Sequence, residues 1–214
     1  MILARAIAVV IGYLCGLLQT GYFYGKGQGV DIRTKGSGNA GTTNSLRVLG
    51  VKAGAITLTG DCIKAIIAVV ITHFLFRNLY PDGVKLLEIY AGFGAVLGHN
   101  FPFYLKFKGG KGIACTAGVI ISLCPWWFTL LCLIVFILIV AITRYVSLGS
   151  IVIVLLFLAG VFVCNQFGML GVAENYVIEF DIVAVCFTAM ALWRHRANIR
   201  RLVQGTENKF SFKK

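Results

Sequence analysis

The chain has 214 residues, of which 58% are hydrophobic and only 13% are charged, and its mean hydropathy is +0.86. A soluble domain is about half apolar and about a quarter charged, so this composition excludes a disordered chain, a coiled coil and a soluble secreted module. The formal charge of +12 is scattered among apolar segments and forms no nucleic-acid-binding motif, so we expect no nucleic-acid partner. An integral membrane protein remains.

A membrane-spanning helix needs about 20 mainly apolar residues, and the sequence offers seven such segments, some of them short. In chain order they are Ile2 to Tyr24, Val51 to Phe76, Leu86 to Tyr104, the two parts of Gly112 to Thr143, Ser147 to Leu170, and Val177 to Trp193. The long segment divides at Cys124-Pro125-Trp126-Trp127, because proline disfavours helix continuation and tryptophan favours the membrane interface. We therefore predict an all-α integral membrane protein with one domain, residues 1–214, and seven transmembrane helices. Five spans is the alternative, with the segments that begin at Leu86 and Gly112 lying only partly in the bilayer.

Basic residues predict the orientation, because cytoplasmic loops of membrane proteins carry an excess of Lys and Arg. With the N-terminus outside, only Arg5, Arg77 and Lys85 lie on the outer side. The inner loops and the tail then hold Lys26, Arg33, Lys35, Arg47, Lys52, Lys106, Lys108, Lys111, Arg144, Arg194, Arg196, Arg200, Arg201, Lys209, Lys213 and Lys214. The C-terminus is therefore predicted to be cytoplasmic. No small-x-small cleavage site follows the first apolar run, so we expect an uncleaved first helix instead of a signal peptide.

Four polar clusters interrupt the apolar segments, all on the predicted cytoplasmic side. The first, residues 35–47, has a G-x-G-x-x-G spacing, but a membrane segment and not a strand precedes it, so a dinucleotide site is not indicated. Its glycines allow backbone N–H groups to converge, Arg47 suits a phosphate, and a helix beginning near Thr43 would point its N-terminus at the loop. Further hydrogen-bonding side chains are those of Ser37, Asn39, Thr43 and Asn44. A flexible loop with an interfacial arginine is the alternative.

The second cluster joins Gly98-His99-Asn100-Phe101-Pro102 to Phe107-Lys108-Gly109-Gly110-Lys111-Gly112. Two lysines flank a glycine pair just before an apolar helix, an arrangement that can hold an anion. It is not a Walker A loop, because Gly112 stands where Ser or Thr would contact magnesium. A positive anchor at the membrane surface is the alternative for the lysines, but it does not explain glycines that weaken a helix start.

The third and fourth clusters each place two polar residues three positions apart. In Arg144-Tyr145-Val146-Ser147-Leu148-Gly149-Ser150, the two serines can share a helical face while the arginine extends to the interface. In the tail, His195 and Asn198 can contact one ligand, followed by Arg200-Arg201 and Gly205-Thr206-Glu207. For the tail, an orientation signal after the last span is the alternative.

Asp61 and Lys64 stand inside the second predicted span, three positions apart. Ionisable residues in a membrane are costly and often functional, but a neighbouring opposite pair can satisfy itself. We interpret them as a supporting pair near the inner surface. His73 and His99 show no metal-ligand arrangement, so we predict no metal site.

In order and spacing the four clusters resemble the bacterial acyl-phosphate:glycerol-3-phosphate acyltransferase family, the PlsY type. The resemblance covers almost the whole chain and rests on Gly36-Ser37-Gly38-Asn39, Thr43-Asn44, Arg47, Gly98-His99, Pro102, Phe107 to Gly112, Arg144 to Ser147, and His195 to Glu207. Ala40 and Thr42 depart from the family's usual residues without replacing a polar position.

The resemblance implies that an acyl group moves from acyl phosphate to the 1-hydroxyl of sn-glycerol 3-phosphate, giving lysophosphatidic acid and inorganic phosphate in phospholipid biosynthesis. It implies no acyl-CoA, no acyl carrier protein and no cofactor, and a monomer in a bacterial inner membrane with its active site facing the cytoplasm. The expected catalytic residues are Ser37, Arg47, Lys111, His195 and Asn198, with Glu207 structural. The expected substrate-binding residues are Gly38, Asn39, Thr43, Asn44, Lys108, Gly109, Gly110, Gly112, Arg144, Ser147 and Ser150.

The identity of the proton acceptor stays open in the sequence. The His-x4-Asp motif of another acyltransferase class is absent, since His73, His99 and His195 are followed five residues later by Asn78, Tyr104 and Arg200. Acyl phosphate has a good leaving group, so orientation and charge stabilisation can lower much of the barrier. Our hypothesis is that a substrate phosphate, with a second pKa of about 6, accepts the hydroxyl proton. His195 as general base is the rival.

A transporter for organic phosphate anions is the alternative function. Such a protein is expected to have inverted repeats and a binding site near the middle of the bilayer. The sequence shows no repeat, and its polar groups gather at one face.

Overall fold

The computed structural model describes residues 1–210, and within that range the chain is all helical with no strand. The α-helices are α1 (Ile2–Gly16), α2 (Thr20–Gly27), α3 (Thr42–Leu49), α4 (Val51–Phe76), α5 (Val84–Asn100), α6 (Ile113–Leu123), α7 (Trp126–Thr143), α8 (Val146–Gln166), α9 (Val177–Arg194) and α10 (Arg196–Val203). Short 3₁₀ turns are η1 (Ile32–Thr34), η2 (Phe103–Leu105) and η3 (Glu174–Tyr176). The predicted all-α class is confirmed. Lys213 and Lys214, which contributed to the predicted orientation, lie outside the described residues.

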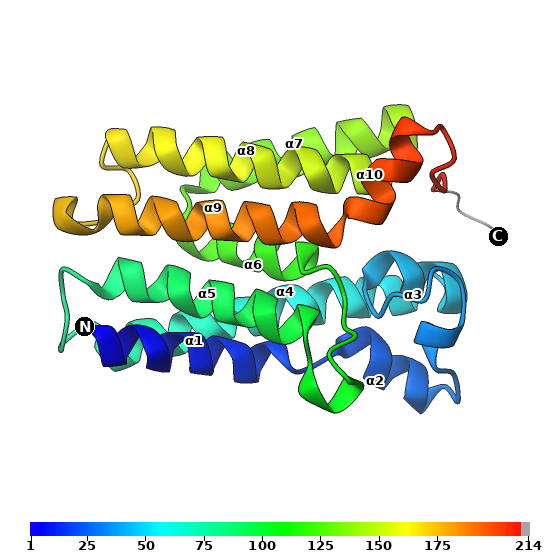
Figure 1. Cartoon of the computed structure of the whole chain (residues 1–214), viewed down its shortest axis with the longest axis horizontal. Coiled ribbons are helices and arrows are strands. Elements are labelled where there is room, and N and C mark those ends of the chain that lie inside the picture. Colours follow the sequence, from blue (N-terminus) through cyan, green and yellow to red (C-terminus); the bar gives the residue numbers. More distant parts are fainter. Residues whose placement is uncertain (211–214) are drawn as a thin grey trace.

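The long helices run along one common axis, with α3 and α10 at one end of the bundle (Figure 1). Segments long and apolar enough to cross a membrane are Ile2–Gly27, Val51–Phe76, Trp126–Thr143, Val146–Gln166 and Glu174–Arg194. With 17 residues, α5 is just shorter than these, and α6 has 11. At about 1.5 Å per residue α6 covers roughly half of a ~30 Å hydrocarbon core. The number of complete spans, seven or five, therefore stays a prediction.

The division of the long apolar segment is confirmed, because α6 ends at Leu123 and Pro125 precedes the first residue of α7. The first predicted span, Ile2 to Tyr24, lies within Ile2–Gly27, which is long and apolar enough to cross a membrane, but its helix is interrupted. It breaks after Gly16 and resumes at Thr20, where the side-chain amide of Gln19 donates to the carbonyls of Gly16 at 3.3 Å and His99 at 3.1 Å. The buried side chain of Gln19 thus ties the break to the end of α5.

Apolar side chains cover much of the outside of the bundle. In α7 the mean hydropathy is 2.7, yet only 11% of the residues in that window are buried inside the protein. A soluble protein does not leave such a large contiguous apolar surface in water. These faces contact lipid, and the chain is an integral membrane protein.

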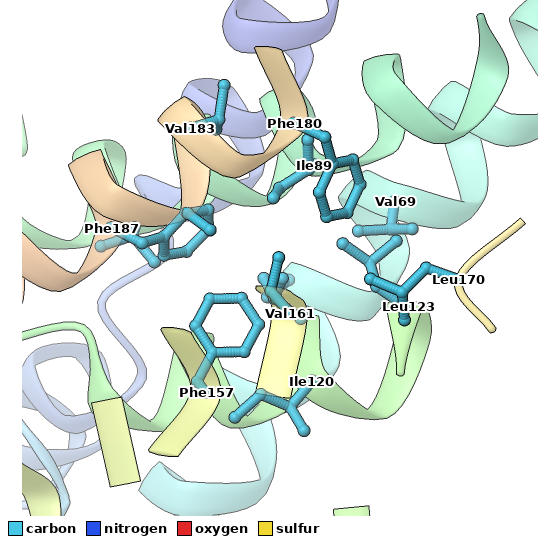
Figure 2. Close-up of a cluster of buried hydrophobic side chains, with 14 of the residues drawn as sticks. Val69, Ile89, Ile120, Leu123, Phe157, Val161, Leu170, Phe180, Val183 and Phe187 are labelled. Carbon is cyan, nitrogen blue, oxygen red and sulfur yellow. The ribbon is translucent and has the colours of Figure 1, made fainter. Parts of the chain in front are cut away.

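The interior is built from large apolar side chains of several helices and from very close helix contacts elsewhere. Figure 2 shows Phe157 and Val161 of α8 packed beside Phe187 of α9 in the main buried cluster. Between α1 and α5 the contact is closer, because a Cβ at Gly94 or Gly98 would overlap the main chain of α1. Small residues allow such backbone approach in membrane proteins. This packing fixes the C-terminal end of α5 beside the break in the first segment.

Ionisable groups at the opposite end of the bundle pair with one another. Arg5 of α1 binds Glu179 of α9 at 2.6 Å, and the hydroxyl of Tyr90 donates to the same carboxylate at 2.8 Å. Glu88 accepts from Lys85 at 3.0 Å and lies 2.7 Å from the Nδ1 of His73. Arg5, His73 and Lys85 thus each have an acidic partner at this end.

Candidate active site

All four polar clusters meet at one end of the bundle, as predicted from the sequence. Figure 1 places the loop between α2 and α3, the loop between α5 and α6, the junction of α7 with α8, and α10 together at one end of the bundle. The N-terminus lies at the other end. The site is therefore assembled from segments far apart in the sequence.

The first loop is organised by Asn44, which is 1% exposed on α3. Its side-chain nitrogen donates to the carbonyls of Ile32 at 2.7 Å, Asn39 at 2.9 Å and Lys35 at 3.1 Å. Its side-chain oxygen accepts from the backbone N–H of Ser37 at 2.8 Å. The Asn44 amide is thus fully used by the loop, and a role in substrate binding, which stays a prediction, would come through the loop's shape.

Other polar groups of this loop stay available to a ligand. The helix begins at Thr42, close to the predicted start, and the side-chain oxygen of Asn39 accepts from the N–H of Gly41 at 2.9 Å. Ser37 and Arg47 are exposed, and within residues 1–210 neither side chain hydrogen-bonds another protein group. A phosphate could therefore bind both without displacing a contact.

In the second loop the glycine pair is held tightly by its neighbours. The N–H of Gly109 donates to the carbonyl of Asn100 at 3.2 Å, and that of Gly110 to the carbonyl of His99 at 3.1 Å. From the end of α9, the Arg194 guanidinium donates to the carbonyls of Gly109 at 3.0 Å and Gly110 at 2.6 Å. Neither glycine N–H is free for an anion, so the predicted role of these glycines in substrate binding would depend on the loop's shape.

The next residue, Lys111, belongs to a hydrogen-bond network that joins the second loop to α10 and the tail. Its Nζ donates to the side-chain oxygen of Asn198 at 2.5 Å, and the Asn198 amide donates to Glu207 at 2.7 Å. Glu207 also accepts from the hydroxyl of Ser147 at 3.0 Å and from Arg201 at 2.7 Å. Predicted site residues from three clusters thus share one network.

Burial lowers the pKa of Lys111 to about 8. The Glu207 carboxylate acts in the opposite direction, while the positive charges of Arg201, Arg194 and Arg47 lower this pKa further. Burial would raise the pKa of Glu207, but its hydrogen bonds from Arg201, Asn198 and Ser147 outweigh burial and hold that pKa below its usual value. The site therefore contains more cations than acids, with one carboxylate among several basic groups, and this favours an anionic ligand.

His195 lies at the junction of α9 and α10 and is 2% exposed. Burial and the neighbouring charge of Lys111 lower the pKa of His195 to about 4, so the imidazole is neutral at neutral pH. Its Nδ1 lies 2.8 Å from the carbonyl of Ala191 and must donate to it, which leaves Nε2 as an acceptor. His195 can accept a hydrogen bond or a proton from a ligand.

The remaining predicted residues lie at the edge of this network. Lys108 and Arg144 are exposed, and the hydroxyl of Ser150 donates to the carbonyl of Val146 in its own helix at 2.9 Å. Arg144 adopts a left-handed conformation at the end of α7, and its carbonyl accepts from the N–H of Phe210. Within residues 1–210, no group of three His, Cys, Asp or Glu side chains could hold a metal ion.

The sequence model of the family described as glycerol-3-phosphate acyltransferase matches residues 6–205. The chain belongs to the glycerol-3-phosphate acyltransferase family. The glycerol-3-phosphate acyltransferase of Clostridioides difficile (strain 630) is 45% identical over 100% of this chain and 98% of its own length. That of Halalkalibacterium halodurans is 44% identical over 97% of this chain and 96% of its own length.

Solved structures agree with this assignment. The crystal structure of PlsY (YgiH), an integral membrane glycerol 3-phosphate acyltransferase, in its glycerol 3-phosphate form matches with a TM-score of 0.81 and 33% identity over 97% of this chain and 96% of that chain. The lysophosphatidic acid form matches with a TM-score of 0.78 and 31% identity, with the same coverage. The resemblance stated from the four clusters is confirmed, and so is the enzyme class, a membrane acyltransferase of phospholipid biosynthesis.

Within this glycerol-3-phosphate acyltransferase fold, the structure adds residues that the sequence did not select. The sequence indicates Arg194 only as an orientation signal, yet it binds the glycine pair, and Arg201, a residue of the tail motif with no predicted role, binds Glu207. Both belong to a basic stretch after an apolar span, where position alone does not separate an anchoring arginine from a bonded one. The roles of the individual site residues stay predictions.

Proposed function

We propose that the protein transfers an acyl group from acyl phosphate to the 1-hydroxyl of sn-glycerol 3-phosphate. The hydroxyl oxygen bonds to the acyl carbon, and the bond between that carbon and the phosphate oxygen breaks. The products are 1-acylglycerol 3-phosphate (lysophosphatidic acid) and inorganic phosphate, and the hydroxyl proton passes to a base. The reaction is balanced without a cofactor.

The observation that carries this proposal is the position of Lys111. Its ammonium group is tethered by Asn198 at the polar end of an apolar bundle, close enough to Arg47, Arg194 and Arg201 that their charges lower its pKa. Two phosphorylated substrates need several cations, and an acyl chain needs an apolar surface that starts beside them. Both features meet at this end of the molecule, where charge-assisted hydrogen bonds to phosphate are strong.

We assign each residue a role from its charge and from the protein groups that its side chain contacts. Arg47, Lys111 and Lys108 neutralise phosphate oxygens, Ser37 donates to one, and Arg144 lies at the rim. Asn198 and Ser147 both donate to Glu207, and Asn198 holds Lys111 in place. Gly38, Asn39, Thr43 and Asn44 shape the first loop, Gly109, Gly110 and Gly112 shape the second, and Ser150 stabilises the start of α8.

The proton acceptor is a substrate phosphate in this proposal, with neutral His195 orienting the hydroxyl through Nε2. Since the pKa of His195 is lowered to about 4, the ring is a weak base. Replacing His195 by Gln keeps a hydrogen-bonding group but removes the base. Single-turnover acyl transfer should then fall only modestly at saturating substrate, whereas near-complete loss with intact binding would favour His195 as the base.

The proposal includes the arrangement in the cell. The whole chain, residues 1–214, acts as one domain and as a monomer in the bacterial inner membrane, with seven spans. The basic end faces the cytoplasm and the N-terminus faces outward, because cytoplasmic loops carry the excess of Lys and Arg.

The deciding experiment mixes the purified protein with acyl phosphate and glycerol 3-phosphate and measures release of inorganic phosphate together with lysophosphatidic acid. Release must need both substrates and must be lost in Lys111→Gln, while Lys209→Gln, an exposed lysine of the tail, serves as control. The transporter alternative predicts uptake of glycerol 3-phosphate into proteoliposomes without phosphate release. That outcome would contradict the proposal.

A further inference from the structure

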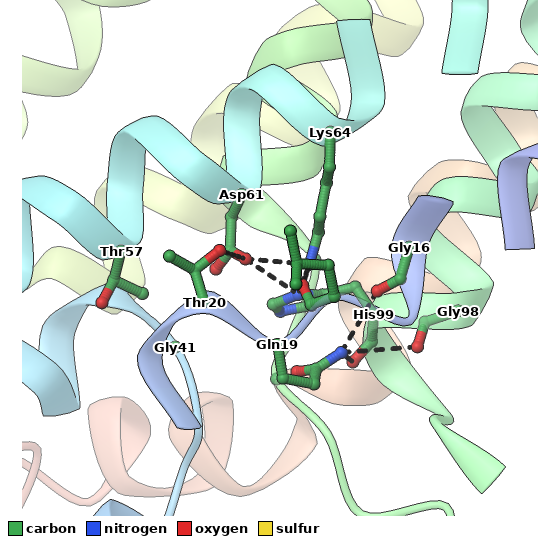
Figure 3. A network of polar contacts seen from close by, with 12 residues as sticks. Gly16, Gln19, Thr20, Gly41, Thr57, Asp61, Lys64, Gly98 and His99 are labelled. Carbon is green, nitrogen blue, oxygen red and sulfur yellow. Dashed lines mark hydrogen bonds and ion pairs between the residues drawn. The ribbon is translucent and has the colours of Figure 1, made fainter. Parts of the chain in front are cut away.

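A buried polar network lies beside the break between α1 and α2 (Figure 3). Lys64 and Asp61 of α4 are 3% and 1% exposed and lie 2.8 Å apart. The Lys64 Nζ also donates to the carbonyl of Leu18 at 2.5 Å and lies 2.9 Å from the Nδ1 of His99. The hydroxyl of Thr20 donates to Asp61 at 3.1 Å. The predicted supporting pair is therefore present, and it includes a third partner, His99.

The network fixes the protonation pattern of the His99 ring. An ammonium group has three N–H donors and no acceptor, so the three contacts of Lys64 use all its donors. The Nδ1 of His99 must accept, and the ring proton lies on Nε2. Because His99 is 3% exposed and bound to a buried charge pair, its ring cannot rotate away without leaving Lys64 short of a partner.

The other edge of the His99 ring lies against Gly110. A Cβ at Gly110 would overlap Nε2 of His99 and would come within 2.8 Å of Cε1 and 2.9 Å of Cδ2. The main chain of His99 also accepts from the Gly110 N–H, and Arg194 binds the Gly110 carbonyl. Gly110 is thus held by α5 and by α9 at the same time.

We infer that His99 is a positioning residue, whose ring is held by the Asp61–Lys64 pair as a fixed support for Gly110 and thereby for Lys111. The inference rests on the proposed function, in which Lys111 binds a substrate phosphate. Lys111 follows Gly110 directly, so a displaced glycine shifts the ammonium group relative to Asn198. A charge pair inside the membrane region therefore acts on the site through the histidine ring.

A double-mutant cycle between His99 and Gly110 tests the contact. Gly110→Ala should strongly lower the thermal unfolding midpoint of the protein in detergent, because the new Cβ meets a ring that cannot move. In His99→Ala the ring is gone, so adding Gly110→Ala should cost little. Residues in contact show such non-additivity, whereas independent sites add.

Gly109 provides the matched control. A Cβ at Gly109 would overlap the main-chain carbonyl of His99, which His99→Ala does not remove. Gly109→Ala should therefore cost as much in His99→Ala as in the natural chain. If Gly110→Ala leaves no folded protein, recovery of folding in the double variant shows that the His99 ring packs against Gly110 as inferred. Additive losses for both glycines, or no recovery, overturn it. His99→Asn replaces His99→Ala in the cycle if the latter does not fold.

Steady-state kinetics test the positioning role of His99. KM for glycerol 3-phosphate should rise about tenfold in His99→Ala, since misplacing a binding group by about 1 Å can cost up to a hundredfold. His99→Gln, whose amide can accept from Lys64 and donate toward Gly110, should restore KM to near the natural value. His73→Gln, which changes the histidine bound to Glu88, should leave KM unchanged. An unchanged KM in folded His99→Ala overturns the inference. The unfolding cycle needs no substrate, so it still decides the contact if the natural chain shows no acyl transfer.

Discussion

At the scale of single residues, one carboxylate orders the candidate site. Glu207 accepts hydrogen bonds from Ser147, Asn198 and Arg201, which come from α8 and α10. It is the only acid in the network among the described residues, and its charge opposes the burial that lowers the pKa of Lys111 to about 8. Glu207 therefore affects both the position and the charge of Lys111.

Replacing Glu207 by Gln should shift the pH profile of acyl transfer. The pKa of Lys111 is about 8, and loss of the Glu207 carboxylate lowers it. The ammonium form, which binds phosphate in the proposed function, is then lost at a lower pH. The alkaline limb of kcat/KM for glycerol 3-phosphate should move toward lower pH. Glu174→Gln, in the turn before α9, serves as control. An unshifted limb in Glu207→Gln would contradict the assigned electrostatic role.

Replacing Asn44 by Ala should destabilise the first loop. The change removes four hydrogen bonds. The carbonyls of Ile32 and Lys35 keep a backbone donor, whereas the carbonyl of Asn39 and the N–H of Ser37 lose their partner. A buried polar group left unsatisfied costs about 1–3 kcal/mol. Both the unfolding midpoint and acyl transfer should fall. Asn208→Ala, at an exposed position, should change neither. Equal behaviour of the two variants would show that Asn44 does not hold the loop.

The sequence predicts which residue types gather at the site, but not which of them bind a ligand and which bind the protein's own backbone. His195 and Asn198 are selected by their spacing and Lys111 by its place beside a glycine pair, and the structure places the three together. Asn44 is selected as a hydrogen-bonding side chain of the glycine-rich loop, yet its amide faces the loop's own backbone. An amide can bind a ligand or a carbonyl equally well, so only the three-dimensional neighbours decide.

At the scale of helices, the contact between α1 and α5 positions the C-terminal end of α5. Close packing sets α5 so that its last residues lie under the glycine pair. The division at Pro125 is a local effect of proline, so sequence alone predicts it. The break at Gln19 is not local, because the amide also binds the His99 carbonyl, which lies far away in the sequence.

Replacing Gly94 by Ala should prevent proper packing of α5. The added Cβ would overlap the carbonyl of Val9 in α1, and a backbone atom cannot move aside as a side chain can. We expect a large loss of folded protein, measured by size-exclusion chromatography in detergent. Gly27→Ala, at the end of α2 with nothing within 4 Å, should be tolerated. A well-folded Gly94→Ala protein would contradict the described packing.

At the scale of the whole molecule, charge is divided between the two ends of the bundle. Cations exceed acids around the four clusters, while at the far end Arg5 and Lys85 are paired with acids. The hydropathy of the sequence predicts the membrane class, and its basic residues predict one common end for the clusters. The short α5 and α6 leave the number of complete spans to experiment.

Labelling with a membrane-impermeant thiol reagent tests the seven-span arrangement. In a chain whose seven cysteines are replaced by alanine, Asp82→Cys should react only from outside and Lys106→Cys only from the cytoplasm, since α5 separates these exposed positions. Acyl transfer by the cysteine-free chain is the control for folding. Reaction of both positions from one side would contradict seven complete spans.

The occupied N–H groups of Gly109 and Gly110 have a consequence for how the proposed reaction proceeds. Backbone N–H groups bind an anion at one fixed position, whereas an exposed lysine or arginine side chain can change rotamer and stay in contact with an anion that moves. During transfer, one phosphate stays attached to glycerol while the other departs as a free ion. In the proposed reaction the exposed Arg47 and Lys108 can adjust to both phosphates, while Lys111, tethered by Asn198, keeps its place.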